Sequence, residues 1–274
     1  MHRHQDALYH SPDWLDLHFN AKRDHRARTA KLFDLRRGDR VLDVGCGSGA
    51  WTEIFLNSIG YNGEVIGIDP LPGNIERARR KATLLDVSNV QYRGGQADDL
   101  STIEGRFDVI HLGNVAGYFP NCEKLFRSLR ARLRPGGRLI VRQHDEGAFL
   151  LYPVREALLA RIKAAIALER ERLSSEKTFD LYAGRHLGTD LDRSGFRRVD
   201  RRVIPFEAVA PFEISLQAYI RATCKWMLEA AGPSLVEAER LEWESAILRP
   251  LAEKTAAKAF YMFEIEYLYH AYIA

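Results

Sequence analysis

The sequence predicts an α/β protein built around a doubly wound parallel sheet. Between residues 40 and 143, short apolar runs alternate with helical stretches, which is the pattern of parallel strands covered by helices on both faces. The first apolar run leads into a glycine-rich turn at residues 45–49, and the second ends in the acid Asp69. A glycine turn followed by an acid after the next strand is typical of sheets that bind nucleotides.

The first half of the chain carries this alternating pattern. Residues 12–35 have apolar side chains at helical spacing and predict one or two helices, with Pro12 near the start. The predicted strands lie at 40–44, 64–68, 90–93, 107–112 and 138–143. The predicted helices between them lie at 50–59, 73–85 and 122–133.

The pattern changes after residue 143. Pro153 opens a long predicted helix that extends to about Leu173, and a polar stretch at 174–178 ends it. A short helix between Gly184 and Gly195 is followed by a sixth strand at 196–206. The remaining segments are a helical region at 212–257 and an aromatic tail at 259–273, for which a seventh strand and a buried helix are both open.

The glycine turn is suited to holding a ligand against the backbone. Gly45, Gly47 and Gly49 follow the apolar strand directly, so the chain turns sharply at a point where any side chain would block a ligand. The turn also presents free amide N–H groups at the start of a helix, which favours a polar or anionic ligand. Asp69 follows at the separation, about 20 residues, at which an acid binds ribose hydroxyls in doubly wound folds.

Two cofactor classes fit a glycine turn of this kind. The residues Gly45, Gly47 and Ala50 also match the dinucleotide fingerprint. An acid inside the first strand, Asp43, and a third close glycine at Gly49 are not required by that fingerprint. A Pro-Gly-Gly turn at 135–137, between a helix end and a new strand, is a further distinguishing feature.

With these motifs the sequence resembles the class I S-adenosylmethionine-dependent methyltransferases. The resemblance covers roughly residues 38–145, with the motifs in the family's order and spacing: Asp43-x-Gly45-x-Gly47-x-Gly49, Asp69, Phe107-Asp108-Val109-Ile110 and Leu133-Arg134-Pro135-Gly136-Gly137. It implies a Rossmann-like sheet of seven strands, mostly parallel and with an antiparallel last strand. It also implies that S-adenosyl-L-methionine is the cofactor.

The resemblance assigns a role to each cofactor-binding position. The glycine turn is expected to pack against the methionine part of the cofactor, with Cys46 as a small filler, and Asp69 to bind both ribose hydroxyls. The segment after the third strand is expected to surround the adenine; Gln96 stands where the family usually has an acid, so Gln96 and Asp98 are alternative partners for the adenine amino group. The full expected set is Asp43, Gly45, Cys46, Gly47, Gly49, Asp69, Pro70, Gln96, Ala97, Asp98 and Leu112.

The change of pattern predicts four parts of the chain. Residues 1–37 are expected to form an N-terminal helical cap, and residues 38–211 the Rossmann-like core, which includes a lid segment at 146–190. Residues 212–257 are expected to be a helical insertion that caps the site, and residues 258–274 the final strand of the core. Capping of this extent favours a discrete small molecule as the acceptor.

Composition limits the other classes of function. The formal net charge is +3 with the charges scattered, so no nucleic-acid-binding patch is predicted. The 3 cysteines are far apart and form neither a disulfide framework nor a metal pair, which favours a reducing, cytoplasmic location and no metal. Neither a membrane-spanning run nor a secretion signal is recognised, and the expected state is a monomer or homodimer.

Two histidines are the candidates for a catalytic base. Ligands of doubly wound sheets bind beyond the carboxyl ends of the strands, where His111 and His144 are predicted to lie. His144 is the first candidate because imidazole titrates near neutral pH and Asp145 or Glu146 follows as an orienting partner. His111 is the second candidate, and for both residues a role in shaping the pocket is the alternative.

These observations predict an S-adenosylmethionine-dependent methyltransferase that acts on a small organic metabolite, with secondary metabolism as a setting suggested by analogy. One alternative is a protein of the same fold that binds the cofactor without methyl transfer, as a cyclase or binding module. A second is an NAD(P)-dependent oxidoreductase, but the segment 118–122 offers no lysine for a Tyr-x-x-x-Lys motif.

Overall fold

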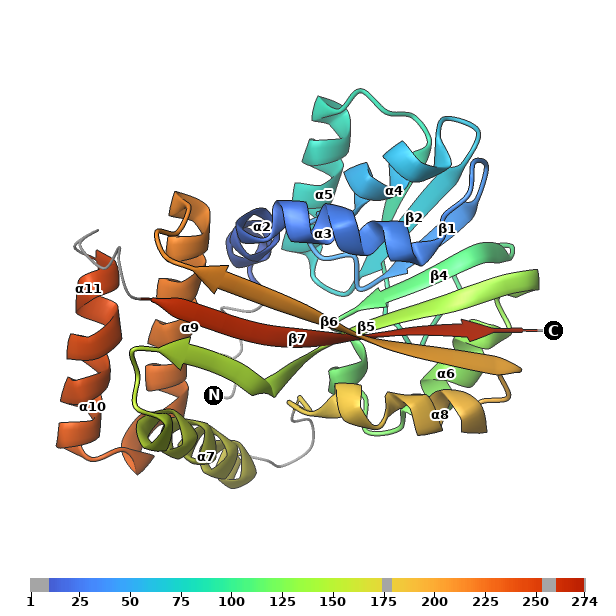
Figure 1. The fold of residues 1–274 in the computed structure, drawn as a ribbon. Coiled ribbons are helices and arrows are strands. Elements are labelled where there is room, and N and C mark those ends of the chain that lie inside the picture. The colour runs from blue at the N-terminus through green and yellow to red at the C-terminus, as the bar shows by residue number, and fades with distance from the viewer. Residues whose placement is uncertain (1–9, 174–178, 253–259, 274) are drawn as a thin grey trace. The chain divides into compact units, whose positions relative to one another are not determined.

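The computed structural model describes residues 10–173, 179–252 and 260–273. Its centre is a sheet of 7 strands in the order β3-β2-β1-β4-β5-β7-β6 (Figure 1). The strands are β1 Arg40–Val44, β2 Glu64–Asp69, β3 Val90–Gly94, β4 Phe107–Gly113, β5 Leu133–Tyr152, β6 Arg198–Val209 and β7 Tyr261–Tyr272. The predicted fold class, a doubly wound Rossmann-like sheet, is confirmed.

The strand directions follow the prediction. Strands β1 to β5 pair in parallel, with Asp43 opposite His111 and Gly113 opposite Arg142 in the registers that matter for the site. Strand β7 runs antiparallel to β6: the amide of Arg197 donates to Tyr272 at 2.8 Å, and the amide of Ala210 donates to Phe260 at 2.8 Å. Residue numbers therefore rise along one strand as they fall along the other.

The main helices begin and end close to the predicted positions. Helix α2 starts where Ser11 accepts a hydrogen bond from the amide of Trp14, with Pro12 at the first helical position. The other helices are α3 Arg23–Ala30, α4 Thr52–Ile59, α5 Pro72–Leu84, α6 Cys122–Arg130, α7 Glu156–Leu173, α8 Leu187–Arg193, α9 Ile214–Ala231, α10 Glu237–Trp243 and α11 Arg249–Ala252; α2 itself spans Pro12–Ala21.

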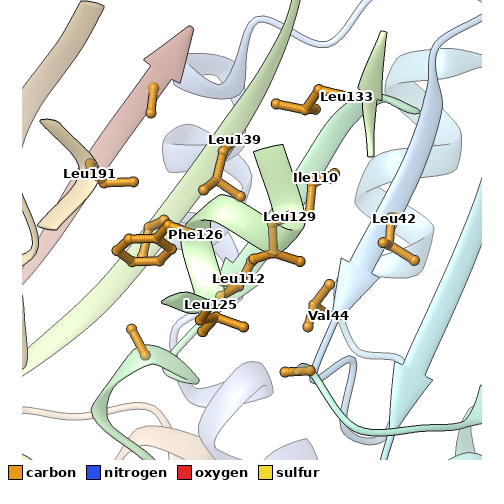
Figure 2. Packing of buried hydrophobic residues seen from close by; sticks show 14 of the residues in the cluster. Leu42, Val44, Ile110, Leu112, Leu125, Phe126, Leu129, Leu133, Leu139 and Leu191 are labelled. Atoms are coloured by element: carbon orange, nitrogen blue, oxygen red, sulfur yellow. The ribbon is translucent and has the colours of Figure 1, made fainter. Parts of the chain in front are cut away.

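The central core forms where α6 packs against the sheet. Its apolar face carries Leu125, Phe126 and Leu129, which lie beside side chains from β1, β4 and β5 (Figure 2). Because apolar residues recur every three to four positions in this short helix, one face is buried and the other stays charged. The buried strand side chains in this cluster include Leu42, Val44, Ile110, Leu112 and Leu139.

The chain divides into two compact units. The first, called the helical unit here, comprises Met1–Arg23, Glu146–Thr178 and Pro205–Ile265. The second, called the core unit, comprises Asp24–Asp145, Phe179–Ile204 and Glu266–Ala274. Each unit is therefore assembled from three separate segments of the sequence.

Strands β5 and β6 differ from the predicted boundaries, β6 spanning Arg198–Val209 instead of 196–206, whereas the predicted seventh strand is confirmed. Strand β5 extends from Leu133 to Tyr152 instead of 138–143, so residues 146–152, expected in a lid, belong to a strand. Polar side chains such as Gln143 and Asp145 end the apolar run without ending the strand, because both are buried with hydrogen-bonding partners. The tail is strand rather than helix, since buried and partly exposed residues alternate along β7 with a period of two.

A buried polar cluster joins α2, α9 and β7 within the helical unit. The ammonium of Lys22 pairs with the carboxylate of Glu264 and also lies 3.1 Å from the hydroxyl of Tyr219 and 3.3 Å from Nε2 of His18. The hydroxyl of Tyr219 donates to the second oxygen of Glu264 at 3.2 Å. Burial, with Glu264 and Glu146 nearby, raises the pKa of Tyr219 well above its usual value, so the phenol stays protonated.

We expect this ion pair to matter for stability only as a pair. Lys22→Met should lower the free energy of unfolding by about 3–5 kcal/mol, because it leaves the Glu264 carboxylate buried without its counter-charge. The double substitution Lys22→Met with Glu264→Leu should recover most of that loss. Denaturant unfolding measures both, and an equally unstable double variant would contradict the pair.

His270 on β7 of the core unit introduces a pH dependence. Burial, together with Arg138 and Arg202, lowers its pKa to about 4, against about 6.5 in an unfolded chain. The folded protein therefore disfavours the imidazolium, so this contribution to stability is complete above pH 6.5 and is lost as the pH falls toward 4. The loss amounts to about 3 kcal/mol, since one pKa unit corresponds to about 1.4 kcal/mol.

The substitution His270→Asn should flatten the stability curve of the protein between pH 6.5 and 4. Denaturant unfolding at several pH values compares the two proteins. Parallel curves for the wild type and the variant would show that His270 does not titrate across this range on unfolding.

Candidate functional site

The glycine turn between β1 and α4 has the backbone conformation that only glycine adopts readily. Gly45, Gly47 and Gly49 have positive φ values of 71°, 54° and 70°. The amides of Gly45 and Cys46 donate to the carbonyl of Ile68 at 2.8 and 2.9 Å, which ties the turn to β2. A Cβ at Gly45 would collide with Val115, so the turn packs against the loop after β4 too closely for a side chain.

Asp69, at the end of β2, connects the elements of the predicted cofactor site. Its carboxylate accepts from the amide of Gly47 at 2.9 Å, the amide of Leu71 at 3.0 Å and the side-chain amide of Asn74 at 3.0 Å. Its carbonyl accepts from the amide of Gly95 at 3.2 Å. The turn after β1, the start of α5 and the loop after β3 therefore meet at one residue.

Burial raises the pKa of the Asp69 carboxyl above its usual value. Its three hydrogen bonds lower the pKa, but their effect is smaller than that of burial. Asn74 Oδ1 is buried and has no hydrogen-bond partner among the residues that the structure describes. Asn74 Oδ1 and the remaining lone pairs of the Asp69 carboxylate can therefore accept hydrogen bonds from the hydroxyl groups of a ligand.

The predicted adenine loop lies directly beside Asp69. Residues 96–99 form a tight turn in which the amide of Asp99 donates to the carbonyl of Gln96 at 3.2 Å. Gln96 and Asp98 are exposed, and Ala97 is buried in the central cluster. Pro70 is exposed next to Asp69. Both candidates for the adenine amino group remain predictions.

Asp43 and His111 form a buried pair across β1 and β4. Nδ1 of His111 lies 2.8 Å from Oδ1 of Asp43. The rings of Phe33, Trp51 and Phe55 surround the imidazole at centroid distances of 5.4, 5.6 and 5.2 Å. Leu112, the neighbour of His111, points into the central apolar cluster and is fully buried.

His144 lies near the carboxyl end of the parallel part of β5 and is half-buried. Its amide donates to the side-chain oxygen of Asn114 at 2.8 Å, which joins the ends of β4 and β5. Nε and Nη2 of Arg185 donate to the two oxygens of Asp145 at 2.7 and 2.9 Å, and the orienting role of Asp145 or Glu146 stays a prediction. The planar fork of an arginine matches a carboxylate in this way.

The segment that carries Arg185 is fixed to the core unit at several points. The amide of Asp180 donates to Gly117 at 2.7 Å, and the ring of Phe179 lies 4.6 Å from that of Tyr118. The hydroxyl of Tyr269 donates to the carbonyl of Gly184 at 2.7 Å. Within the core unit, residues 179–186 thus lie against the loop that follows β4.

Two buried charged residues, Arg142 and Glu266, were not among the predicted site residues. Arg142 on β5 is buried, pairs with Glu266 of β7 at 2.5 Å, and places its guanidinium 4.5 Å from the Trp51 ring. The signal was a charged residue directly after the apolar run Leu139–Val141, which is uncommon in a buried strand. Its partner lies in the tail, so the pairing required the strand order.

Within the ranges that the structure covers, no group of three or more His, Cys, Asp and Glu side chains is arranged to hold a metal ion. Among the described helices, none has both the length and the apolar character needed to cross a bilayer.

Comparison with known proteins decides the family. A family model described as a methyltransferase domain matches residues 17–201, which is more than half of the chain. The chain belongs to this methyltransferase family. The resemblance to S-adenosylmethionine-dependent methyltransferases is therefore confirmed, and with it S-adenosylmethionine as the family's cofactor. The oxidoreductase alternative has no support.

Individual relatives of this methyltransferase-family chain match part of it. A demethylmenaquinone methyltransferase of Listeria monocytogenes serotype 4a (strain HCC23) is 32% identical over 114 residues, which are 42% of this chain and 48% of that protein. The chain thus spans about half the length of the curated relatives it matches.

Solved structures share the fold over most of the chain. The YcgJ protein of Bacillus subtilis superimposes with a TM-score of 0.56 at 16% identity, covering 92% of this chain and 98% of that one. The [4+2]-cyclase SpnF has a TM-score of 0.51 at 17% identity, covering 90% and 81%. At these identities the likeness concerns the fold alone.

The residues present fit the family's cofactor. The turn packs closely against Val115 and Tyr92 because Gly45 and Gly49 lack side chains, which leaves its backbone as the surface offered to a ligand. Asp69 has lone pairs left for hydroxyl donors, and Oδ2 of Asp43 is buried without a hydrogen-bond partner among the described residues. Polar acceptors thus line the side on which a hydroxylated, amine-bearing ligand would bind.

We expect Asp69→Ala to weaken binding of S-adenosylhomocysteine by about 1–3 kcal/mol, the usual loss when a charged hydrogen-bond acceptor is removed. Asp69→Asn, which keeps one acceptor oxygen, should give a smaller loss. Isothermal titration calorimetry measures both. The control is Glu76→Ala on the exposed face of α5, where an ion pair with Arg80 contributes little. Unchanged affinity in Asp69→Ala would rule out the ribose role.

Proposed function

We propose that this chain transfers the methyl group of S-adenosylmethionine to a small organic molecule. The observation that carries the proposal is the convergence of the glycine turn, Asp69 and the loop at 95–98 at the carboxyl ends of β1, β2 and β3. The partial relatives are named for demethylmenaquinone, an individual organic molecule, which supports a small acceptor over a polymer.

The proposed roles divide between binding and alignment. Asp69 would hold the ribose, the glycine turn with Asp43 and Cys46 the methionine part, and the loop at 95–98 the adenine. The cofactor supplies an electrophilic methyl group on a sulfonium, whose sulfur leaves as a neutral thioether. The protein's own task is then to align the acceptor and exclude water.

The two candidate bases differ in their orienting partners. A general base is normally held in place by a third group. His144 is followed by Asp145 and Glu146, the two partners expected to orient it. His111 has the Asp43 carboxylate at 2.8 Å from Nδ1. Because this contact places an orienting carboxylate on its imidazole, we favour His111 as the base.

The regions predicted as caps are proposed to bind the acceptor. Residues 212–257 include α9 and α10, in which Trp243, Cys224 and Trp226 are buried and Nε1 of Trp243 donates to the carbonyl of Cys224 at 3.0 Å. The part of the lid segment that is not strand includes α7 and residues 179–186. Substitutions in these regions should change acceptor binding more than binding of S-adenosylhomocysteine.

The biological setting is proposed on narrower grounds. The three free thiols are buried, and burial raises the pKa of Cys122 to about 12, so these cysteines suit a reducing, cytoplasmic location. A monomer or homodimer, absence of nucleic-acid binding and a role in secondary metabolism are proposals that rest on the scattered charge and on analogy.

Incubation with S-adenosylmethionine and pools of small alcohols, phenols, amines and activated carbon acids tests the proposal. We expect S-adenosylhomocysteine, measured by mass spectrometry, to form only when the correct acceptor is present. His111→Gln should lower turnover about 100-fold or more, the usual effect of losing a general base, and His144→Gln should have the smaller effect. Tight cofactor binding without product from any pool would favour the non-transferring alternative.

A further inference from the structure

Four ionisable side chains are buried together near the glycine turn of the core unit. The exposed fractions are 2% for Asp43, 1% for His111, 2% for Arg142 and 6% for Glu266. They form two pairs, Asp43 with His111 and Arg142 with Glu266. Buried ion pairs add little or nothing to stability compared with apolar residues of similar size, so their presence asks for another explanation.

The two pairs meet at Gly113, the last residue of β4. Asp43 is in register with His111, and Gly113 is in register with Arg142, so the side chains lie on one face of three adjacent strands. A Cβ at Gly113 would lie 2.9 Å from Nη2 of Arg142 and 3.4 Å from Nε2 of His111. The guanidinium and the imidazole therefore approach the same point, at the edge of the sheet where ligands bind.

Each pair leaves at least one polar atom without a hydrogen-bond partner among the described residues, and Oδ2 of Asp43 is a further one. Nε2 of His111 and Nε of Arg142 are buried, and neither has a hydrogen-bond partner in the part of the chain that the structure describes. Buried polar atoms without partners are rare and often mark a bound water or a functional site. Both the Asp43–His111 pair and the Arg142–Glu266 pair thus leave hydrogen-bonding capacity unused.

The protonation states of these two atoms follow from their pairs. An ionised Asp43 carboxylate can only accept, so Nδ1 of His111 donates to it, and in the neutral imidazole Nε2 then offers a lone pair. Nε of Arg142 always carries a proton. A single partner placed between these two atoms would therefore both donate and accept a hydrogen bond, which is the property of a hydroxyl group.

We propose that His111 and Arg142 form a subsite for the hydroxyl group of the methyl acceptor, which makes the reaction an O-methylation. This inference rests on the proposed methyltransferase function and names its substrate class. The hydroxyl donates to Nε2 of His111 and accepts from Nε of Arg142. Asp43 and Glu266 are positioning residues, each holding one of the two groups.

The arrangement accounts for the proton that O-methylation releases. As the oxygen forms its bond to the methyl carbon, the carbon–sulfur bond of the sulfonium breaks and its electron pair goes to sulfur. The hydroxyl proton passes to Nε2 of His111, and the Asp43 carboxylate stabilises the resulting imidazolium. The guanidinium of Arg142 stabilises negative charge on the oxygen before the bond forms.

The surroundings of His111 limit the charges that act on it. The rings of Phe33, Trp51 and Phe55 cover the imidazole, and Trp51 has the guanidinium of Arg26 5.5 Å from its centroid in addition to Arg142. The charged groups that face this region are Asp43 from β1, Arg142 from β5, Glu266 from β7 and Arg26 from α3. An ordered water is the other occupant with the required chemistry.

Nuclear magnetic resonance of histidine-¹⁵N-labelled protein tests the subsite without turnover. The spectrum of His111, assigned by its loss in His111→Gln, should show a proton on Nδ1 and none on Nε2. In the presence of S-adenosylhomocysteine, phenol as the probe should shift the Nε2 resonance. Arg142→Met should abolish that shift, whereas Arg138→Met, a matched buried arginine on the same strand, should retain it.

The outcomes separate a hydroxyl site from a water site. A resonance that phenol up to its solubility limit leaves unchanged, or a proton on Nε2 instead of Nδ1, overturns the proposal and leaves water as the occupant. Because Arg142→Met strands a buried carboxylate, Arg142→Met with Glu266→Gln serves as the second variant. It should melt near the wild-type temperature and still fail to respond to phenol.

Kinetics with the acceptor found in the pools separates the subsite from the function itself. Arg142→Lys keeps the charge but lacks the Nε donor, and should lower kcat/KM for a hydroxyl acceptor about 100-fold while leaving the KM for S-adenosylmethionine unchanged. An amine or carbon acceptor, or a variant with wild-type kcat/KM, would refute the subsite while methyl transfer stands. A phenol shift without product in any pool would refute methyl transfer while the subsite stands.

Discussion

The hydrogen bonds of Asp69 hold together the part of the core unit that is proposed to bind the cofactor. One carboxylate reaches the amide of Gly47, the amide of Leu71 and the side chain of Asn74, and the backbone of the same residue binds Gly95. Three loops from different strands are thereby fixed to the end of β2. The glycines allow close approach of the backbones, and the Asp69 carboxylate fixes the positions of the loops because it accepts several N–H groups at once.

Much of this arrangement was readable from residue types and spacing. The alternation of apolar runs predicted the five parallel strands, and the glycine spacing predicted the sharp turn after β1, because both depend on local chemistry. The prediction was less accurate where long-range contacts decide. Strand β5 continues beyond residue 143 because Gln143 and Asp145 find partners on Gly117 and Arg185, which only the folded chain brings near.

The same limit explains the residues that were missed. Arg142 and Glu266 are far apart in the sequence, and nothing in either segment indicates the other. His111 was recognised as a candidate, but its partner Asp43 was assigned to the cofactor alone, since the pairing depends on the register of β1 and β4. Which buried charged residues pair depends on the strand order. A sequence motif therefore identifies one residue of a pair and does not indicate its partner.

The strand order has a consequence for how the polypeptide acquires its structure. Strand β6 touches the sheet only through β7, although β7 is made more than fifty residues later, after α9, α10 and α11. On the ribosome, the nascent chain therefore holds an edge of β5 uncovered and a detached β6 until the last strand inserts between them. Late closure of this kind slows folding and exposes an aggregation-prone edge. Strand β6 carries Arg198, Arg201 and Arg202, and charged residues of this kind oppose aggregation through an unpaired strand.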